Sequence, residues 1–481
     1  MSLTRPAVSP MQTGKLIRNV SALVVAQGIT KVLNFAVSIA LVRYLGVQEL
    51  GRYSYVVAFA FPFGALADFG LAAFSIREIS RDLSRTSEVM AVLQRSLLLL
   101  AGAMSIAMVG LAVLARHDAL TTACIAIVAL SNLISAATSP FLVRLTARED
   151  MHLLSLYRVV ASAIGAGATL VILIWGGGVF ALFAAAAVVN AVMWYIGRSL
   201  AGPIAFGASV PLSAIRSMVS QAAPFGFLLL GFALYYRVDI IMLRWLRDES
   251  EVGLYAAAYR FLDAIILLAA TLGSPFFPRL SNWAGRDQQG VRDLIESSWK
   301  LLLVLGLPVT VITFFVAYPL IQVLFGSEFV RAGAFLQILI WGSLPILLIN
   351  IPSHALNAAD RVWALAGVFV LSALVNVLAN LLLIPGWGAM GASLATVACE
   401  WLNLVLVARL VQREFHVSFS PDGLWRYFLA VTSMVLVLWL ARDYGLVVMM
   451  LGALLAYGAG LLLLGYLRSA EILAMRRLFA Q

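Results

Sequence analysis

Long runs of apolar residues, separated by short polar stretches, recur along this chain of 481 residues. Each run is long enough to cross the apolar core of a bilayer as an α-helix, which takes about 17 to 25 residues. A helix is also the only open element that satisfies its own backbone hydrogen bonds inside lipid. The pattern predicts fourteen membrane-spanning helices, at 19–42, 54–76, 93–115, 119–143, 154–175, 178–198, 219–243, 254–277, 299–324, 333–356, 361–384, 388–410, 425–441 and 444–467.

One short pattern occurs twice along the chain. Residues 41–55, LVRYLGVQELGRYSY, are echoed roughly 200 residues later by 242–256, MLRWLRDESEVGLYA. The match aligns the first span with the seventh and the second with the eighth, so the period is six helices. Because six is even, both halves enter the membrane in the same direction. We therefore predict an all-α polytopic membrane protein with two pseudo-symmetric six-helix bundles, residues 1–200 and 201–415, and two additional helices in 416–481.

The repeated pattern has an interpretation at the membrane surface. Arg43 and Arg244 each stand before an aromatic residue at the end of a predicted outward-running span. Aromatic rings favour the membrane interface, and arginine extends from there to the headgroups. The glycine of the Gly-x-Tyr that follows then lets the chain turn back. This pattern predicts that both arginines are membrane anchors.

Composition and charge agree with a membrane protein. The chain is 62% hydrophobic and only 12% charged, which is too little charge for a water-facing surface. Its net charge of +10 does not call for nucleic acid, because most Lys and Arg fall at cytoplasmic ends when both termini are cytoplasmic. The N-terminus has no signal-peptide cleavage pattern, so the first run is expected to stay as a span. Cys124 and Cys399 lie in different spans and predict neither a disulfide nor a metal site, and no cofactor is expected.

Ionisable residues inside spans are the candidates for function, because each costs about 2.5 to 3.5 kcal/mol on insertion scales. Seven such residues occur, namely Lys31, Asp68, Arg237, Asp239, Arg260, Asp263 and Glu400. In the first span, Gln27, Lys31, Asn34 and Ser38 share one helical face. Two interpretations of this stripe are open: a polar seam between packed helices, or the lining of a water-filled cavity.

The seventh and eighth spans carry a second polar group. Tyr235 and Arg237 lie in the seventh span, and Arg260 and Asp263 lie three residues apart in the eighth. Arg260 and Asp263 are therefore placed to pair with each other. Alternatively, the two guanidiniums face a central space together with Lys31, and form a basic trio suited to the phosphate oxygens of a polyanion.

Carboxylates inside the membrane offer another role. Asp68, Asp263 and Glu400 are candidates for holding a coupling proton or Na⁺, as buried carboxylates in transporters do. No predicted outer loop exceeds roughly a dozen residues, so no catalytic domain lies outside the membrane. Nucleotide-binding signatures are absent too. The sequence therefore predicts a protein that acts within the membrane and is not an enzyme.

Three segments resemble the polysaccharide flippase branch of the multidrug, oligosaccharidyl-lipid and polysaccharide exporter superfamily. They are LVRYLGVQELGRYSYVVAFAFPFGALADFGLAAFSIREISR at 41–81, LIQVLFGSEFVRAGAFLQILIWG at 320–342 and IPGWGAMGASLATVACEWLNLVL at 384–406. The resemblance implies a V-shaped pair of bundles in a bacterial inner membrane, with both termini cytoplasmic. It implies transport of an undecaprenyl-pyrophosphate-linked oligosaccharide to the outer leaflet for O-antigen, capsule or exopolysaccharide, with other polysaccharide assembly proteins as possible partners.

In that superfamily the first, second, seventh and eighth spans line the cavity, so the resemblance implies a pyrophosphate site among their polar residues. The expected substrate-binding residues are Lys31, Arg237, Arg260, Gln27, Asn34, Ser38 and Tyr235. Two competing functions are a multidrug and toxin extrusion antiporter coupled to Na⁺ or H⁺, and a membrane glycan polymerase or ligase. The basic trio argues against the antiporter, and the short outer loops argue against the polymerase.

Overall fold

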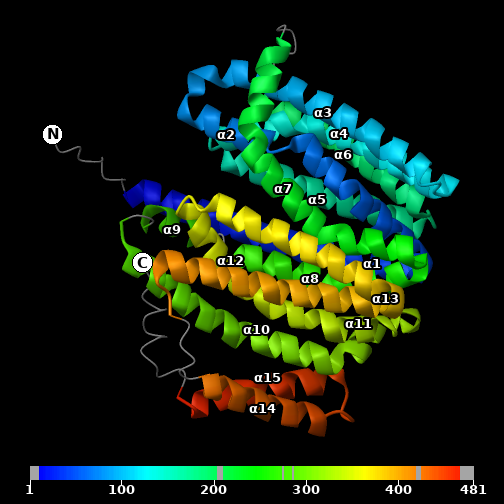
Figure 1. Ribbon diagram of the computed structural model, residues 1–481, viewed down its shortest axis with the longest axis vertical. Helices are drawn as coiled ribbons and strands as arrows, with labels where there is room; N and C mark the ends of the chain where they lie inside the picture. The colour runs from blue at the N-terminus through cyan, green and yellow to red at the C-terminus, as the bar shows by residue number, and fades with distance from the viewer. Residues whose placement is uncertain (1–9, 203–209, 274–275, 284–285, 419–423, 466–481) are drawn as a thin grey trace. The chain divides into compact units, whose positions relative to one another are not determined.

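The protein is entirely helical in the parts that the computed structural model describes, residues 10–202, 210–273, 276–283, 286–418 and 424–465 (Figure 1). The α-helices are α1 (Pro10–Asp68), α2 (Leu71–Arg81), α3 (Thr86–Leu114), α4 (Ala119–Ala147), α5 (Met151–Ile174), α6 (Val179–Ala201), α7 (Leu212–Leu246), α8 (Glu249–Gly273), α9 (Phe277–Trp283), α10 (Gln288–Phe325), α11 (Ala332–Leu339), α12 (Ser343–Ala358), α13 (Val362–Phe415), α14 (Leu424–Leu440) and α15 (Leu446–Leu463). Short 3₁₀ turns occur at Leu83–Arg85, Ser327–Phe329 and Ile340–Gly342.

Ten helical segments among the described residues are long and apolar enough to cross a membrane. Two of these, Leu33–Arg81 and Val362–Phe415, each cover residues of two expected spans. Helix α1 kinks at Gly46 (φ 68°) and ends at Asp68, before Phe69 and Gly70 lead into α2, and α13 kinks at Gly388 (φ 55°). Helices α7 and α14 cover two more expected spans without being among the ten. The prediction of an all-α polytopic membrane protein is therefore confirmed.

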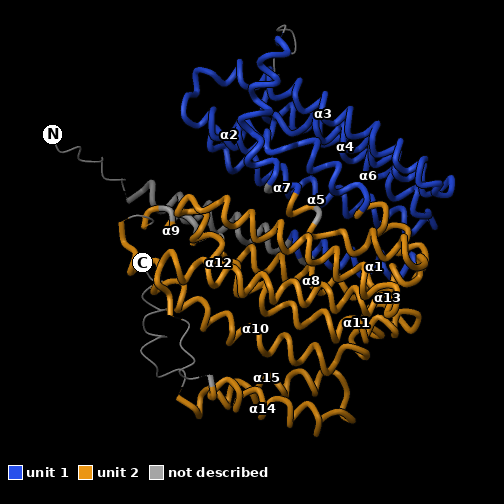
Figure 2. Tube along the Cα trace, in the orientation of Figure 1, with its two compact units in different colours: residues 1–45, 59–230 blue, residues 46–58, 231–481 orange. Residues whose placement is uncertain are grey.

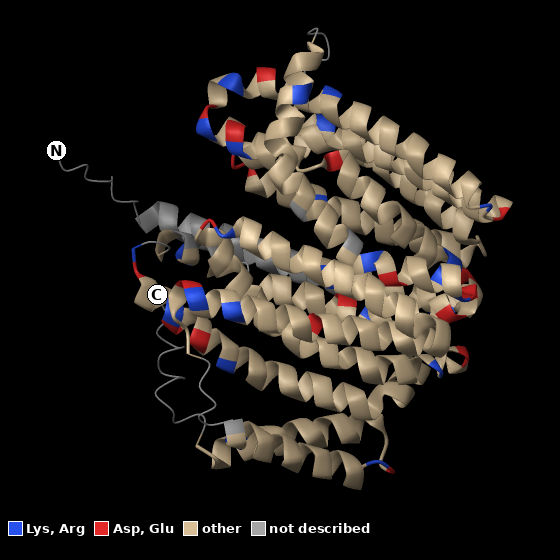
Figure 3. Ribbon diagram, in the orientation of Figure 1, with Lys and Arg blue, Asp and Glu red and all other residues tan. Residues whose placement is uncertain are grey.

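Large apolar side chains lie on the surface of these helices, as lipid contact requires. Leu382 is 79% exposed and Leu463 is 87% exposed, which would be unfavourable in water but is not in hydrocarbon. Figure 3 shows that charged residues are sparse along the middle of most helices and more frequent near their ends. The apolar middle of each helix accounts for the hydrophobic runs in the sequence.

The chain folds into two compact units, shown in Figure 2. Unit 1 comprises residues 1–45 and 59–230, and unit 2 comprises 46–58 and 231–481. The units therefore divide α7 between residues 230 and 231, and they assign the turn after the first span to unit 2. The expected domains, residues 1–200, 201–415 and 416–481, were defined by the sequence repeat, whereas these units are defined by packing. The expected domains therefore stay a prediction.

Each unit has its own apolar core. In unit 1, fully buried Leu71, Leu93 and Phe141 join α2, α3 and α4. In unit 2, a large cluster runs from α10 through α12 to α13, and a separate one packs α14 and α15 against α10. Met434 and Ala453 are completely buried in that second cluster. The two C-terminal helices are thus attached to unit 2 through the face of α10.

The two copies of the repeated pattern contact each other inside unit 2. A Cβ atom on Gly51 would lie 1.9 Å from the carbonyl oxygen of Glu249, and one on Gly253 would lie 1.9 Å from that of Val47. Gly51 and Gly253 are both helical, so the expectation that this glycine turns the chain is wrong. Their function is to let two backbones approach closely, and in the first copy it is Gly46 that kinks the helix.

Arg244 is held by protein contacts. Its guanidinium lies 3.1 Å from Glu249 Oε1 and stands over the ring of Tyr55 at 5.8 Å. Glu249 also lies 3.4 Å from Arg52, which bonds Glu49 as well. Arg244 therefore takes part in an ion network that joins the two copies, and its role as a membrane anchor stays a prediction.

The short loop after α7 and the first turn of α8 together hold the kink in α13. Arg247 donates hydrogen bonds to the carbonyls of Ile384 (3.2 Å) and Pro385 (2.6 Å), where the first half of α13 ends. Glu251 accepts a bond of 3.0 Å from the backbone N–H of Ala389, where the second half begins. A cation at a helix C-terminus and an anion at a helix N-terminus both complement the helix dipole. These side chains thereby satisfy backbone groups that the kink leaves without partners.

Candidate functional site

Helices α7 and α8 place an ion pair inside the apolar body of unit 2. Arg237 Nη2 lies 3.3 Å from Asp263 Oδ1, and the two side chains are 18% and 23% exposed. Tyr236 donates a hydrogen bond to the same carboxylate. The Arg237 guanidinium also stands 4.3 Å from the ring centre of Tyr236 and 5.5 Å from that of Tyr259. Aromatic faces attract a cation, so Arg237 is enclosed on several sides.

Asp263 was also a candidate partner for Arg260, and here the structure differs from that alternative. Asp263 is bound by α7 instead of by the arginine three residues before it on α8. Arg260 is half-buried, and no ion pair is found for it among the described residues. Of the two arginines expected to bind an anion in unit 2, Arg260 is therefore the one whose charge is not already balanced by a carboxylate.

A second polar group joins α7 to α13. Tyr235 donates a 2.7 Å hydrogen bond to Glu400 Oε1 and accepts one of 2.8 Å from Asn403 Nδ2. Ser372 donates in turn to Asn403 Oδ1 at 2.5 Å. Glu400, Asn403 and Ser372 are all buried. Tyr235 and Glu400, which sequence analysis assigned to different roles, therefore belong to one hydrogen-bond network.

A third carboxylate, Asp239, is also buried, and α8 and α13 surround it. Tyr255 donates a 2.5 Å hydrogen bond to Asp239 Oδ2, and Thr396 Oγ1 lies 3.4 Å from the same oxygen. The other oxygen accepts a 2.8 Å bond from the backbone N–H of Ile240. Asp239 therefore meets hydroxyl and amide donors rather than a cation at hydrogen-bond distance.

Sequence analysis missed the contribution of α13 to this site. The helix presents two buried polar stripes, each with helical spacing, and their members are Ser372, Asn376, Asn380, Ser393, Thr396, Glu400 and Asn403. The same stripe criterion that singled out the first span would have found them. Of these residues, only Glu400 was predicted as a functional candidate, because it is ionisable and the others are not.

The polar stripe of the first span lies in unit 1. Asn34 Oδ1 accepts a 2.9 Å hydrogen bond from Ser162 of α5, and Lys31 and Ser38 are half-buried. The Asn34 contact is what a polar seam between packed helices requires, but Asn34 also remains exposed. The side chain of Gln27 lies outside the described part of the structure.

Asp68 also lies in unit 1, at the end of α1. One of its carboxylate oxygens accepts a 3.1 Å hydrogen bond from the backbone N–H of Gly70. Asp68 lines a half-open cavity of about 210 Å³ that is bordered by α1, α3 and α4. Cys124 and Cys399 are both buried, as packing residues are, and neither forms a disulfide bond among the described residues. Among the described residues there is no group of three His, Cys, Asp or Glu side chains that could hold a metal ion.

This arrangement suits binding and movement of charge rather than bond chemistry. Glu400 and Asp239 of unit 2 are held by the neutral hydroxyl groups of tyrosine and threonine. Arg237 and Asp263 form an ion pair, which an anion could break by binding Arg237 and a cation could break by binding Asp263. Such groups are typical of transport pathways in membrane proteins.

Comparison with known proteins gives the family. A model described as "Polysaccharide biosynthesis protein" matches residues 16–283, which is more than half of the chain, and one described as "Lipid II flippase MurJ" matches 223–466. A protein of Haloferax volcanii named "Probable low-salt glycan biosynthesis flippase Agl15" is 26% identical over 192 residues, 40% of this chain and 41% of that relative. The match thus spans about two fifths of the length of the relative.

Solved structures give the fold. A structure of "Lipid II flippase MurJ, inward closed conformation" matches with a TM-score of 0.80 at 14% identity, covering 92% of this chain and 99% of that one. An inward-facing "multidrug resistance MATE family transporter of the MOP superfamily" matches with a TM-score of 0.60 at 14% identity, covering 80% and 94%. At these identities the likeness concerns the fold alone.

The resemblance that the sequence motifs indicated is confirmed by these matches. The named relatives are flippases and transporters, so the prediction that the chain is not an enzyme is confirmed as well. The chain belongs to the polysaccharide biosynthesis protein family.

Proposed function

We propose that the protein moves a lipid-linked oligosaccharide from the cytoplasmic to the outer leaflet of a membrane by alternating access. The observation that carries this proposal is the set of charged and polar side chains that α7, α8 and α13 hold within an apolar helical unit. Charge at this depth is costly unless a polar substrate uses it. The family match and the glycan flippase name of a relative support a glycan as the cargo.

The charged part of the cargo is, in our proposal, an undecaprenyl pyrophosphate. A pyrophosphate must leave water to cross the membrane, and fixed positive charge offsets that loss. Arg260 is the leading residue for this role because no carboxylate balances its charge among the described residues. Arg237 contributes once its bond to Asp263 is exchanged for a phosphate oxygen. Lys31 stays a predicted contributor, as do the polar residues of its stripe.

The remaining parts of the proposal concern topology. We propose fourteen spans in two six-helix bundles arranged as a V, with two further helices at the C-terminus, and the long apolar helices among the described residues support the presence of many spans. Both termini are placed in the cytoplasm of a bacterium, with the chain in its inner membrane and other polysaccharide assembly proteins as partners. The undecaprenyl carrier is proposed together with the bacterial setting. Because a named flippase relative comes from Haloferax volcanii, the identity of the lipid carrier should be measured first.

An ion gradient is the proposed energy source, with Asp68, Asp263 and Glu400 as candidates to hold Na⁺ or H⁺. Each lies on a different helix and has a different set of neighbours. Replacing each carboxylate by its amide should change the dependence of transport on the ion gradient at the residue that carries the ion. If the dependence is unchanged in all three variants, these carboxylates have no part in coupling.

The decisive experiment is mass spectrometry of lipid-linked sugars, sorted by leaflet, in cells that lack the protein and in cells that regain it. We expect an oligosaccharide on a polyprenyl carrier to accumulate on the cytoplasmic side and to clear on restoration. Restoration with Arg260→Gln should clear it slowly at normal protein levels. Arg331→Gln is the matched control, because Arg331 is an exposed arginine at the start of α11. Equal clearance by both variants would remove Arg260 from the site.

The second candidate is a multidrug and toxin extrusion antiporter, which the fold likeness to a MATE transporter favours. The two functions make opposite predictions in the same cells. The antiporter predicts no accumulation of lipid-linked sugar, provided that no second flippase covers the loss, and it predicts greater sensitivity to organic cations. The flippase predicts accumulation and unchanged sensitivity.

A further inference from the structure

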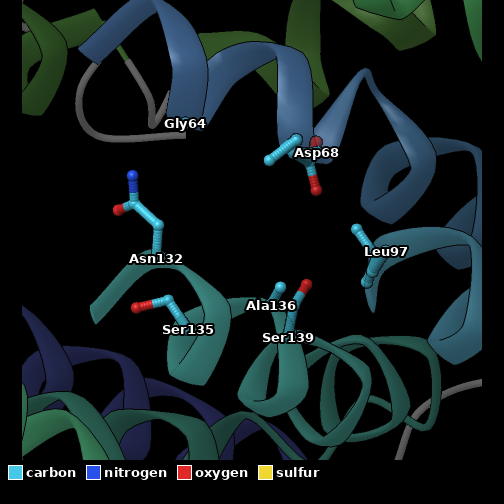
Figure 4. A pocket seen from close by; sticks show the side chains of 8 residues that line it. Gly64, Asp68, Leu97, Asn132, Ser135, Ala136 and Ser139 are labelled. Carbon is cyan, nitrogen blue, oxygen red and sulfur yellow. The ribbon is translucent and has the colours of Figure 1, made fainter. Parts of the chain in front are cut away.

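A cavity in unit 1 gathers oxygen atoms around one carboxylate. Its volume is about 210 Å³, and its polar lining comes from Asp68 at the end of α1 and from one face of α4. Figure 4 shows the side chains of Asp68, Asn132, Ser135 and Ser139 around the same space. Residues 132, 135 and 139 have helical spacing, so α4 presents them to the cavity together.

Most of these polar groups lack protein partners. Among the described residues, no hydrogen bond is found for the side chains of Asn132, Ser135 or Ser139, whereas the Asp68 carboxylate accepts bonds from the backbone N–H groups of Gly70 and Ala72. Polar side chains within a membrane helix are unfavourable unless something binds them. A cavity of 210 Å³ exceeds the roughly 30 Å³ that one water occupies in the liquid, so an ion with several waters has room there.

The backbone around the cavity brings partial charge of both signs, because the Asp68 carboxylate also accepts hydrogen bonds at the start of α2, where the helix dipole is positive. Asp68 is the last residue of α1, where the helix dipole is negative, and Phe69 and Gly70 take positive φ values of 40° and 74° that end the helix. Pro140 lies inside α4 and has no N–H, so the carbonyl of Ala136, which lines the cavity, lacks its usual helical donor. None of the lining residues is basic.

We propose that this cavity binds a single sodium ion between α1 and α4. The ligands are the Asp68 carboxylate, the Asn132 amide oxygen, the hydroxyls of Ser135 and Ser139, and the carbonyl of Ala136. Hard cations prefer oxygen ligands of this kind. One carboxylate balances one positive charge, which favours a monovalent ion over Mg²⁺ or Ca²⁺.

The site would link the ion to the conformation of unit 1. A bound ion joins the end of α1 to the middle of α4 across the cavity, and without it the charge of Asp68 is met only by the backbone N–H groups of Gly70 and Ala72. A role for this ion in driving transport rests on the proposed flippase function. Binding of the ion does not, because it needs neither the lipid nor the sugar.

The test is Na⁺ binding to the purified full-length protein in detergent, in the absence of substrate. Radioactive ²²Na⁺ binding and thermal stability are measured in NaCl and in choline chloride of equal ionic strength, with KCl and MgCl₂ as further arms. We expect saturable Na⁺ binding and a higher Tm in NaCl only. Asp68→Asn should weaken Na⁺ binding by more than about tenfold, and Asn132→Ala should weaken it less, because it removes a neutral ligand.

Asp443→Asn serves as the matched control, since Asp443 is an exposed carboxylate between α14 and α15. It should bind Na⁺ as the wild type does. The proposal is overturned if the wild type shows no preference for Na⁺, or if Asp68→Asn keeps full binding, which would place the ion elsewhere. It is also overturned if Asp68→Asn changes only the pH dependence of stability, because the cavity would then hold a proton. Each of these results leaves the leaflet assay of flippase activity unaffected.

Discussion

The contact between Gly51 and Gly253 supports the sharpest prediction. A methyl group at either position would lie 1.9 Å from a backbone carbonyl oxygen of the facing segment, whereas ordinary contacts begin at 3.4 Å. The two segments must therefore separate by about 1.5 Å to accept one alanine, if the whole shift lies along that line. Backbone atoms on both sides leave no flexible side chain to absorb the change.

The expected cost follows from the behaviour of overpacked interiors, which lose about 1 to 3 kcal/mol. Alanine also has a higher helix propensity than glycine, by about 0.8 to 1.0 kcal/mol, and this gain partly hides the clash. A control removes that term. Gly110 lies inside α3 with nothing within 4 Å of an added Cβ, so Gly110→Ala shows the propensity gain alone.

We expect Gly51→Ala and Gly253→Ala each to unfold at a lower temperature than Gly110→Ala when the purified proteins are heated in detergent. The double variant is more informative than either single one. Once the segments have separated for the first methyl group, the second meets little resistance, so the double variant should be destabilised about as much as the worse single variant. Non-additivity of this kind is expected for residues in direct contact.

Two results would refute this reasoning. Equal stability of the Gly253→Ala and Gly110→Ala variants would mean that the segments are not closely packed. Strictly additive losses in the double variant would mean that each glycine serves its own helix and that the two do not share one contact. Both outcomes are read from the same thermal unfolding curves.

Three further predictions concern the polar contacts of unit 2. Arg237→Gln should lower the free energy of unfolding by less than the roughly 3 to 5 kcal/mol typical of breaking a buried ion pair, because the partner Asp263 is 23% exposed. Adding Asp263→Asn to this variant should restore part of the lost stability. Tyr235→Phe should cost about 1 to 3 kcal/mol, because Glu400 loses a donor and Asn403 an acceptor, whereas Tyr444→Phe at an exposed tyrosine should cost nothing in the same assay. Glu251→Ala should cost about 0.5 to 2 kcal/mol by uncapping the second half of α13, and if Glu251→Gln is as stable as the wild type then the charge is not what matters.

Sequence patterns predicted the fold well because the membrane makes the hydrophobic runs long and regular. The kinks at Gly46 and Gly388 are the positions where adjacent predicted spans join without a loop. Hydropathy separates the spans correctly there, but it cannot show that the helix continues through the kink with one residue in the left-handed region. The backbone conformation of a single glycine is not visible in an average over a window.

The partners of the charged residues were harder to predict, because spacing along one helix shows only neighbours on that helix. Arg260 and Asp263 have the spacing of an ion pair, yet Asp263 binds Arg237 from α7. The aromatic faces of Tyr236 and Tyr259 enclose Arg237, and this favours the longer-range pair. Contacts between helices depend on rotation and depth, which the one-dimensional pattern does not contain.

The repeated pattern shows what a duplicated sequence can reveal beyond topology. Gly51 and Gly253 occupy equivalent positions in the two copies, and each added Cβ would meet the backbone nitrogen of the other glycine at the same 3.1 Å. Such a contact is reciprocal, so it requires glycine at both positions at once. One close approach therefore accounts for a residue that occurs in both copies, where the sequence alone suggested two independent turns. In a chain built from two similar halves, a small residue shared by both copies is a candidate for contact with its own counterpart.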